Sequence, residues 1–268
     1  AEAISHEVGH NIGLSHDGTS TVGYYSGHGS GATGWAPIMG VGYYQALTQF
    51  SKGEYAGANN KEDDFAVAQS YGLPLRADDV GSTIATASAL SGSTANGVTS
   101  AAVQGVIEGA ADADVFAVSA GAGTLNLTLT PSVRAPNADL QLTLLNSAGN
   151  TLTTQNPVDL LNAALTYQIV SPGTYYVMVK GSGKGDPLGT GYTAYGSAGY
   201  YNLAASFAAT GGIAPVASFT ASSNSGIAPL QIQFDASAST DSDGSIRLYN
   251  WDFGDGTVST DWNPQHTY

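Results

Sequence analysis

The first sixteen residues contain three histidines at a spacing that strongly restricts the local fold. His6, His10 and His16 stand in the run HEVGHNIGLSH, which also contains Gly13. Residues four apart on a helix share one face, about 40° apart, so the first two imidazoles would point toward one ion. A glycine one turn later can adopt a left-handed conformation, end the helix and reverse the chain. We therefore expect a helix, a turn at Gly13, and three imidazoles around one point.

The residues around these histidines predict a catalytic zinc site. Three protein ligands leave a fourth position for water, which is typical of catalytic rather than structural zinc. Glu7 follows the first ligand, where its carboxylate can take a proton from a metal-bound water. Ile4, Val8 and Ile12 fall on the opposite face and can enter the core. The alternative is a surface helix with incidental histidines, which the number of matched positions disfavours.

The extended run HEVGHNIGLSHD and the later run GWAPIMG resemble the signature of the metzincin zinc peptidases, in which a Met-turn follows the ligand motif. Asp17 stands directly after the third histidine, and an aspartate at this position resembles the reprolysin or adamalysin branch. Met39 lies 23 positions after His16 and resembles the Met-turn methionine, which forms a hydrophobic floor under the zinc. The resemblance implies one catalytic Zn2+ held by His6, His10 and His16, with Glu7 as general base and structural positions at Gly13, Asp17 and Met39.

Some neighbouring residues depart from the metzincin pattern or receive no role. Val41 stands where some branches have a tyrosine two residues after the methionine. Tyr43 and Tyr44 follow, and neither is assigned a catalytic function. His28 lies in the Gly- and Ser-rich run YYSGHGSGATG, where we expect a solvated loop histidine rather than a fourth ligand.

Residues 1–73 are expected to form the C-terminal part of an α+β metzincin catalytic domain, with an active-site helix, a Met-turn and a closing helix, and with the N-terminal part missing. The run at 62–69 predicts the closing helix, capped by Asn59 or Asn60. Its three acidic residues suit the helix dipole, and calcium binding is the alternative. Without the upstream sheet, we expect the segment as given to have little peptidase activity.

Residues 76–210 read as an all-β module. The runs TLNLTLTP, DLQLTLLN, LTYQIV and TYYVMVK are strand-like and separated by Gly, Pro and Asn. Together with GVIEGAADADVFAV they resemble a bacterial pre-peptidase C-terminal (PPC) domain, a β-sandwich appended to secreted peptidases. Asp112 and Asp114 precede a strand beginning near Val115, and we interpret them as turn formers, with Ca2+ ligands as the alternative.

Residues 214–268 form a second β segment, entered through the linker TGGIAPVA. The runs PVASFTAS, FDASASTDSDGSI, YNWDFGDG and NPQHTY resemble a PKD domain, an Ig-like β-sandwich. The last strand of such a domain is expected beyond Tyr268, so we expect a truncated module. His266 belongs to the closing motif of that family, and its expected role is structural.

The composition excludes several kinds of partner. The 268 residues include 21 acidic and 7 basic ones, a net charge of −14, and no cysteine. No basic stripe is available for phosphates, which argues against nucleic acid and against anionic membranes. No apolar run reaches the roughly 18 residues that span a bilayer. The Gly-, Ala-, Ser- and Thr-rich, lysine-poor composition favours a bacterial protein that is secreted to the extracellular space.

These observations predict a zinc-dependent metalloendopeptidase that hydrolyses extracellular proteins through a zinc-bound water activated by Glu7. The alternative is a non-catalytic secreted adhesion or binding protein that retains a metallopeptidase remnant. The presence of the base Glu7 beside all three ligands favours the enzyme. The PPC and PKD modules are expected to contact extracellular matrix or polysaccharide, and their carboxylates are candidate Ca2+ ligands.

Overall fold

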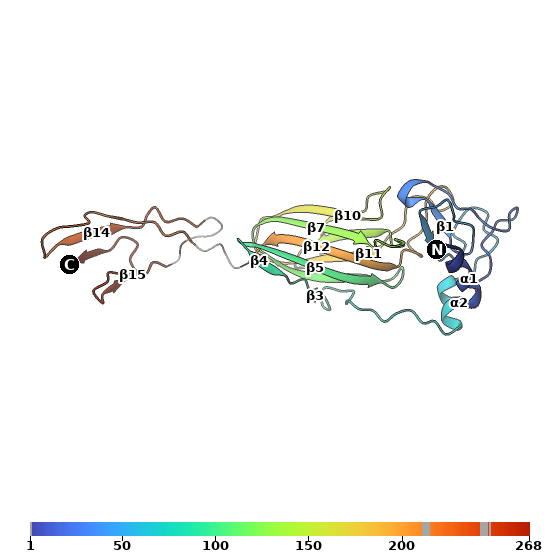
Figure 1. Ribbon diagram of the computed structural model, residues 1–268, viewed down its shortest axis with the longest axis horizontal. Coiled ribbons are helices and arrows are strands. Elements are labelled where there is room, and N and C mark those ends of the chain that lie inside the picture. Colours follow the sequence, from blue (N-terminus) through green and yellow to red (C-terminus); the bar gives the residue numbers. More distant parts are fainter. Residues whose placement is uncertain (1, 211–214, 242–245, 247) are drawn as a thin grey trace. The chain divides into compact units, whose positions relative to one another are not determined.

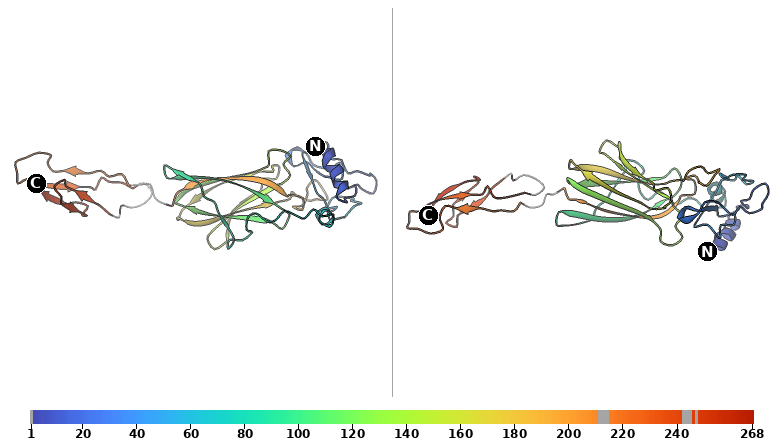
Figure 2. Two further views of the ribbon diagram at one scale, coloured as in Figure 1. Left: turned by 60° about the horizontal axis from the view of Figure 1, so that its bottom comes forward. Right: turned by 90° about the horizontal axis from the view of Figure 1, so that it is seen from above.

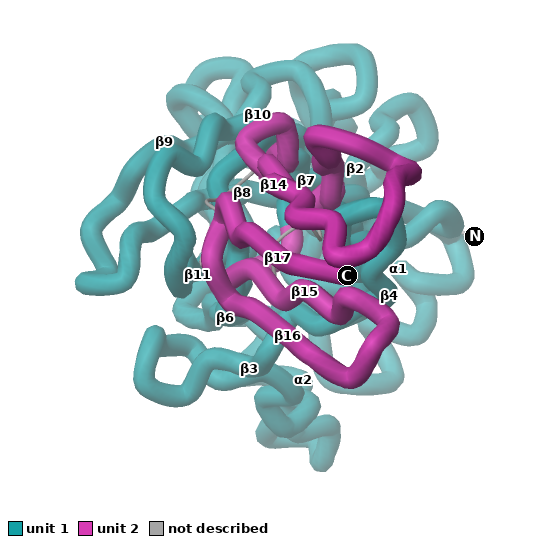
Figure 3. Tube along the Cα trace, turned by 90° about the vertical axis from the view of Figure 1, so that its left-hand side faces the viewer, with its two compact units in different colours: residues 1–208 teal, residues 209–268 magenta. Residues whose placement is uncertain are grey.

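The computed structural model of the 268-residue chain describes residues 2–210, 215–241, 246 and 248–268. Two compact units are present, residues 1–208 and residues 209–268 (Figure 3). The middle of the predicted linker, 211–214, and part of the PKD-like run, 242–245, lie outside the described residues. Within the described ranges, no helix has the length and apolarity needed to cross a membrane.

The first part of unit 1, which we call the amino-terminal segment (residues 2–73), consists mostly of loops. Its elements are α1 (Glu2–Asn11), the 3-10 helix η1 (Gly31–Thr33), β1 (Trp35–Pro37), β2 (Leu47–Gln49) and α2 (Asp64–Ser70). Strands β1 and β2 pair in parallel, with Trp35 opposite Leu47. Both residues are buried and form a small core with Tyr55, and this core includes Leu161 and Tyr192 from the rest of unit 1.

The rest of unit 1 is a β-sandwich (Figures 1 and 2). One five-stranded sheet has the order β10-β7-β12-β5-β4 and the other the order β3-β6-β11-β8-β9. Their bounds are β3 (Ser88–Ala89), β4 (Ser93–Ala95), β5 (Val98–Ile107), β6 (Ala113–Ala120), β7 (Gly123–Pro131), β8 (Leu140–Leu145), β9 (Thr151–Gln155), β10 (Ala163–Ile169), β11 (Gly173–Gly181) and β12 (Gly199–Ala208). All pairings are antiparallel except that of β3 with β6.

Alternating leucines build the core between the two sheets. In β7, Leu125 and Leu127 point inward while the intervening residues are exposed, as a period of two requires. In β8 of the other sheet, Leu140 and Leu142 are fully buried in the same cluster. Each buried leucine contributes about 1.5–3 kcal/mol to stability. The sandwich therefore supplies the large core of unit 1.

Unit 2 is also built of strands. They are β13 (Thr220–Ala221), β14 (Gln231–Asp235), β15 (Trp251–Asp252), β16 (Val258–Ser259) and β17 (Gln265–Thr267). Strands β13, β14 and β17 form one sheet, and β15 pairs with β16. The ring of His266 stacks on Phe253 at 4.3 Å, and its Nε2 lies 2.9 Å from the Asp255 carboxylate. His266 thus packs within this unit.

The α+β catalytic fold expected for residues 1–73 is wrong. Among the described residues, the two α-helices span 10 and 7 residues, and the segment's paired strands are three residues long. Ile4 is 71% exposed and Val8 49% exposed, so the helix face predicted to enter the core does not do so. Histidine spacing and acidic helix starts are local signals, and they contain no information about a sheet beneath the helix. The chain is composed of β modules.

Candidate metal centre

Helix α1 ends through a turn at Gly13. The φ angle of Gly13 is +88°, in the left-handed region. Its amide donates to the carbonyl of His10 at 3.1 Å, and the amide of Leu14 donates to the carbonyl of Gly9 at 3.0 Å, which together form a Schellman motif. The ring of Tyr71 covers the turn, because a Cβ on Gly13 would lie 2.2 Å from it. The left-handed backbone therefore favours glycine here, and any side chain would also have to displace the exposed ring of Tyr71.

The turn brings the three predicted ligands together. Ring nitrogens of His6, His10 and His16 lie within 4.8 Å of one another, and Nε2 of His10 is 2.9 Å from Nε2 of His16. The ring centroids are 4.7 to 5.3 Å apart. Zinc forms bonds of about 2.0–2.1 Å to imidazole nitrogen, so the ligand nitrogens of one ion must lie within a few ångströms of one another, as these do. Three imidazoles without a carboxylate are a suitable donor set for zinc.

Backbone carbonyls orient two of these rings. Nδ1 of His6 lies 3.1 Å from the Ile38 carbonyl, and Nδ1 of His10 lies 3.0 Å from the Leu14 carbonyl. A carbonyl only accepts, so each Nδ1 carries the proton and each Nε2 presents a lone pair. Burial, followed by the neighbouring His10 and His6, lowers the pKa of His16. This favours the neutral imidazole that metal binding needs, and the site therefore fits a metal ion.

A cleft of about 270 Å³ opens beside His6. Glu7, Tyr24, Val41 and Tyr43 are also on its walls. Glu7 is exposed, and none of the described residues hydrogen bonds to its carboxylate. A carboxylate without a partner, one residue from a ligand, is available as a proton acceptor. Val41 presents only an apolar wall where some metzincins have a tyrosine.

Met39 lies in a tight turn that supports α1. The amide of Gly40 donates to the carbonyl of Pro37 at 3.1 Å and closes the turn. Met39 is fully buried, and its sulfur lies where a side chain on Gly9 would be: a Cβ there would be 2.2 Å from Sδ. The amide of Asp17 donates to the carbonyl of Met39 at 2.9 Å. The same turn thus contacts the helix and the loop of the third histidine.

Asp17 is 1% exposed, and its carboxyl is not part of the histidine cluster. The Tyr55 hydroxyl lies 3.4 Å from its Oδ1 and donates to the Gly18 carbonyl at 2.8 Å. The other carboxylate oxygen has no partner among the described residues. Burial, followed by the charge of Glu62, raises the pKa of Asp17 to about 7. Asp17 therefore contacts the site through its backbone.

Helix α2 is capped by Asp63, so the cap predicted at Asn59 or Asn60 is wrong. The Asp63 carboxylate accepts a hydrogen bond from the amide of Ala66 at 2.9 Å. Glu62 instead accepts from the backbone amide directly before the third histidine, at 2.6 Å. Glu62 and Asp63 therefore each accept a specific backbone hydrogen bond, in addition to their favourable position at the start of the helix.

His28 does not lie in solvent as expected. Its Nδ1 is 2.7 Å from the Tyr25 hydroxyl, and its Nε2 is 2.5 Å from the carbonyl of Gly191, which is 163 positions away in the β-sandwich. Both ring nitrogens are occupied, and His28 is not part of the cluster of candidate ligands. The Gly- and Ser-rich sequence around it contains no signal for so distant a partner, so sequence reasoning missed this contact.

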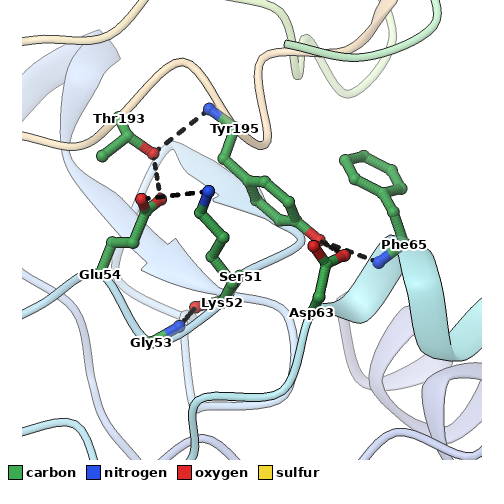
Figure 4. A network of polar contacts seen from close by, with 8 residues as sticks. All are labelled: Ser51, Lys52, Gly53, Glu54, Asp63, Phe65, Thr193 and Tyr195. Atoms are coloured by element: carbon green, nitrogen blue, oxygen red, sulfur yellow. Dashed lines mark hydrogen bonds and ion pairs between the residues drawn. The ribbon is translucent and has the colours of Figure 1, made fainter. Parts of the chain in front are cut away.

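The loop between β11 and β12 (182–198), here called the connecting loop, holds the amino-terminal segment at further points (Figure 4). The Thr193 hydroxyl donates to the carboxylate of Glu54. The Tyr195 hydroxyl donates to Asp63 at 2.7 Å and accepts from the amide of the second residue of α2 at 2.9 Å. The connecting loop thereby fixes the start of α2. Tyr71, the residue after α2, covers the turn at the end of α1.

A second group of carboxylates surrounds the start of β6. Its members are Asp78, Asp79, Glu108, Asp112 and Asp114, in two overlapping sets with oxygens within 4.8 Å of one another. Asp114 lies inside β6 and is fully buried, so its interpretation as a turn former is wrong. One of its oxygens accepts a hydrogen bond from Tyr201, and the other has no partner within the described ranges. Burial is the main cause that raises the pKa of Asp114 to about 7. No lysine or arginine of the described chain pairs with these carboxylates.

Two parts of the chain match known families. Residues 112–181 match the bacterial pre-peptidase C-terminal domain, and residues 213–268 match the PKD domain. A curated relative, collagenase ColQ1 of Bacillus cereus (strain Q1), is 51% identical over 43 residues, which are 16% of this chain and 4% of that protein. The match therefore spans only a small part of the relative's length.

Solved structures resemble the chain more remotely. The pre-peptidase C-terminal domain of a collagenase from Bacillus anthracis is 15% identical, with a TM-score of 0.31, over 48% of this chain and 99% of that one. PliG of Aeromonas hydrophila, a periplasmic inhibitor of g-type lysozyme, is 16% identical, with a TM-score of 0.31, over 44% and 95% of the two chains.

The family matches confirm that PPC and PKD modules are present. Such modules are associated with secreted peptidases and fit a secreted protein. The similarity of the amino-terminal segment to metzincins remains a resemblance that rests on its motif.

Proposed function

We propose that this chain carries the metal centre of a secreted zinc-dependent endopeptidase, with His6, His10 and His16 as ligands and Glu7 as general base. The observation that carries the proposal is the convergence of three imidazoles within 4.8 Å. Two of the rings are already oriented by backbone carbonyls. The unpartnered Glu7 carboxylate favours catalysis over a non-catalytic adhesion protein, which would need no base beside the ligands.

Glu7 and the residues behind it would share the work of the reaction. When bound, zinc lowers the pKa of a water ligand and polarises a carbonyl. Glu7 accepts the proton of the attacking water and passes it to the leaving amine. Met39 fixes the depth of α1 through its contact with Gly9, and the backbone of Asp17 holds the loop of the third ligand.

The PPC and PKD modules support a protein substrate outside the cell. We propose that these modules bind extracellular matrix protein or polysaccharide. The cleft beside His6 receives the peptide to be cleaved. ColQ1 is named a collagenase, so gelatin belongs with casein among the substrates to be tested.

The test separates the base from the ligands. In the full-length natural protein, Glu7→Gln should retain about one zinc per chain and lower kcat by at least about 100-fold, because a base is lost and no ligand is. His10→Ala should lose both zinc and activity. Zinc content is measured by metal analysis, and cleavage is measured on casein and gelatin. Near-normal turnover by Glu7→Gln, or loss of its zinc, contradicts the assignment.

We also propose that the carboxylates around β6 bind Ca2+ and stabilise the sandwich. Asp114 carries this proposal, because a fully buried carboxylate with one oxygen unpartnered among the described residues is costly unless a proton or a cation neutralises it. Asp78 belongs to both overlapping sets of ligand oxygens. Oxygen ligands from several carboxylates are the donors that Ca2+ prefers.

Calcium titration of the melting temperature tests this second proposal. Ca2+ at 100 times its Kd should stabilise the natural protein by about 2.7 kcal/mol. Asp114→Asn keeps an acceptor for Tyr201 but should lose most of this response. Asp159→Asn, which changes an exposed carboxylate paired with Lys184, is the control and should respond like the natural protein. A melting temperature that does not change in millimolar Ca2+ would refute the site.

A further inference from the structure

A tyrosine that the metzincin pattern does not account for stands beside the candidate ligands. The ring of Tyr24 lies 4.4 Å from the ring of His16 and 6.0 Å from the ring of His6. Tyr24 is 48% exposed and lines the same cleft as Glu7. Its hydroxyl has no hydrogen-bond partner in the part of the chain that the structure describes, whereas the hydroxyl of Tyr25 is engaged with a histidine.

The backbone around Tyr24 is well anchored. The amide of Tyr25 donates to the carbonyl of Asp17 at 2.7 Å, and the amide of Val41 donates to the carbonyl of Tyr25 at 2.9 Å. The loop segment that carries Tyr24 therefore lies between the loop of the third histidine and the residues after the Met39 turn. An unpartnered phenol on an anchored backbone is suited to donate to a ligand in the cleft.

The cleft offers few other donors. Glu7 as a base accepts a proton, and the side chain of Val41 has no polar atom. Tyr43 also lines the cleft, but it is 63% exposed and makes no ring contact with the described histidines. During peptide hydrolysis, negative charge develops on the carbonyl oxygen, and an oriented donor there contributes strongly to the rate.

We propose that Tyr24 is a catalytic residue that donates a hydrogen bond from its hydroxyl to the carbonyl oxygen of the peptide bond being cleaved. This proposal rests on the proposed zinc peptidase function. Tyr24 supplies this donor from the loop before the Met39 turn, in a cleft where the Val41 side chain has no polar atom. Glu7 and Tyr24 then serve different atoms of the substrate: Glu7 takes the proton of the water, and Tyr24 stabilises the oxygen.

Removal of the hydroxyl alone tests the proposal. In the full-length natural protein, Tyr24→Phe retains the ring contact with His16 and should keep its zinc. We expect kcat on casein to fall about 100-fold with KM changed less than about twofold, as for loss of one oxyanion donor. Binding of acetohydroxamate, which presents a carbonyl oxygen to a metal centre, should weaken about 5- to 10-fold, as for loss of one hydrogen bond. Tyr44→Phe, at a tyrosine that is 92% exposed and does not line the cleft, is the matched control and should match the natural protein in all three measurements.

Each other outcome decides the question. Unchanged kcat and unchanged acetohydroxamate binding in Tyr24→Phe overturn the proposal, and so do equal losses in Tyr44→Phe. Loss of zinc from Tyr24→Phe shows that the residue only supports the ligands. If the unmodified protein binds no zinc, the proposed function itself fails. If Glu7→Gln behaves as expected and Tyr24→Phe has no effect, only the role of Tyr24 is wrong.

Discussion

The sulfur of Met39 fills the space that a side chain on Gly9 would need. A Cβ built on Gly9 would lie 2.2 Å from that sulfur and 3.5 Å from Leu14. Gly9 stands between the two ligands of α1, so its contact with Met39 sets how deeply His6 and His10 lie against the turn. The second variable position of the HExxH motif is thus restricted here by packing.

Gly9→Ala should therefore destabilise the amino-terminal segment. Overpacking of this kind costs about 1–3 kcal/mol, whereas Met39→Ala alone should cost about 2–5 kcal/mol by leaving a cavity. In the double variant the clash is absent, so the loss should be smaller than the sum of the two. Denaturant unfolding and zinc affinity are measured for all three variants. Gly23→Ala, with no atom within 4 Å of its added Cβ, is the control; strict additivity would contradict the contact.

Two glycines with the same backbone angle separate conformational strain from packing. Gly13 and Gly72 both have φ of +88°, but only Gly13 has a ring, that of Tyr71, within 2.2 Å of its would-be Cβ. Gly72→Ala should show the strain alone, about 1–2 kcal/mol. Gly13→Ala should lose more stability and should also lower zinc affinity, because the turn delivers His16. Tyr71→Ala in that background should recover part of the loss; equal effects of the two alanines would show that Tyr71 is not in contact.

His28→Ala should leave zinc affinity unchanged and lower thermal stability. The substitution leaves the carbonyl of Gly191 without its partner, and an unsatisfied buried acceptor costs about 1–3 kcal/mol. His10→Ala provides the opposite pattern, with a sharp loss of zinc. Metal analysis and thermal unfolding of both variants are sufficient. A zinc loss in His28→Ala equal to that in His10→Ala would mean that the ligand set is misassigned.

The pH dependence of stability should reveal Asp64. Burial raises the pKa of this carboxyl from 3.8 to about 8 in the folded protein. The folded state thus holds a proton that the unfolded state releases, so its contribution to stability is complete below about pH 4 and is lost as the pH rises to about 8. Asp64→Asn keeps an acceptor for the amide of Ser51 and should reduce this slope. Asp159→Asn should retain the slope; an unchanged slope in Asp64→Asn would contradict the burial argument.

How far sequence reasoning reached depends on the range of each interaction. The meeting of His10 and His16 follows from helix periodicity and one glycine, all within a few residues, and it was predicted. The strands of the sandwich were predicted because Gly, Pro and Asn separate its strand-like runs. The α+β fold was predicted and is wrong, because the burial or exposure of Ile4 depends on contacts beneath the helix that the local sequence does not specify. The contact of His28 was not predicted, because its partner Gly191 lies 163 positions along the chain. The cap at Asp63 was not predicted, because several neighbouring polar residues were equally good candidates.

The connecting loop changes what counts as an independent part of this protein. Its contacts through Gly191, Thr193 and Tyr195 mean that the histidine-bearing segment uses the sandwich as its scaffold. An engineer who transplanted residues 2–73 into another protein would move the ligands without the surface that orders them. The smallest transferable form of this metal centre therefore includes residues 182–198, and exchanging the sandwich for a homologous one would require the same three contact positions.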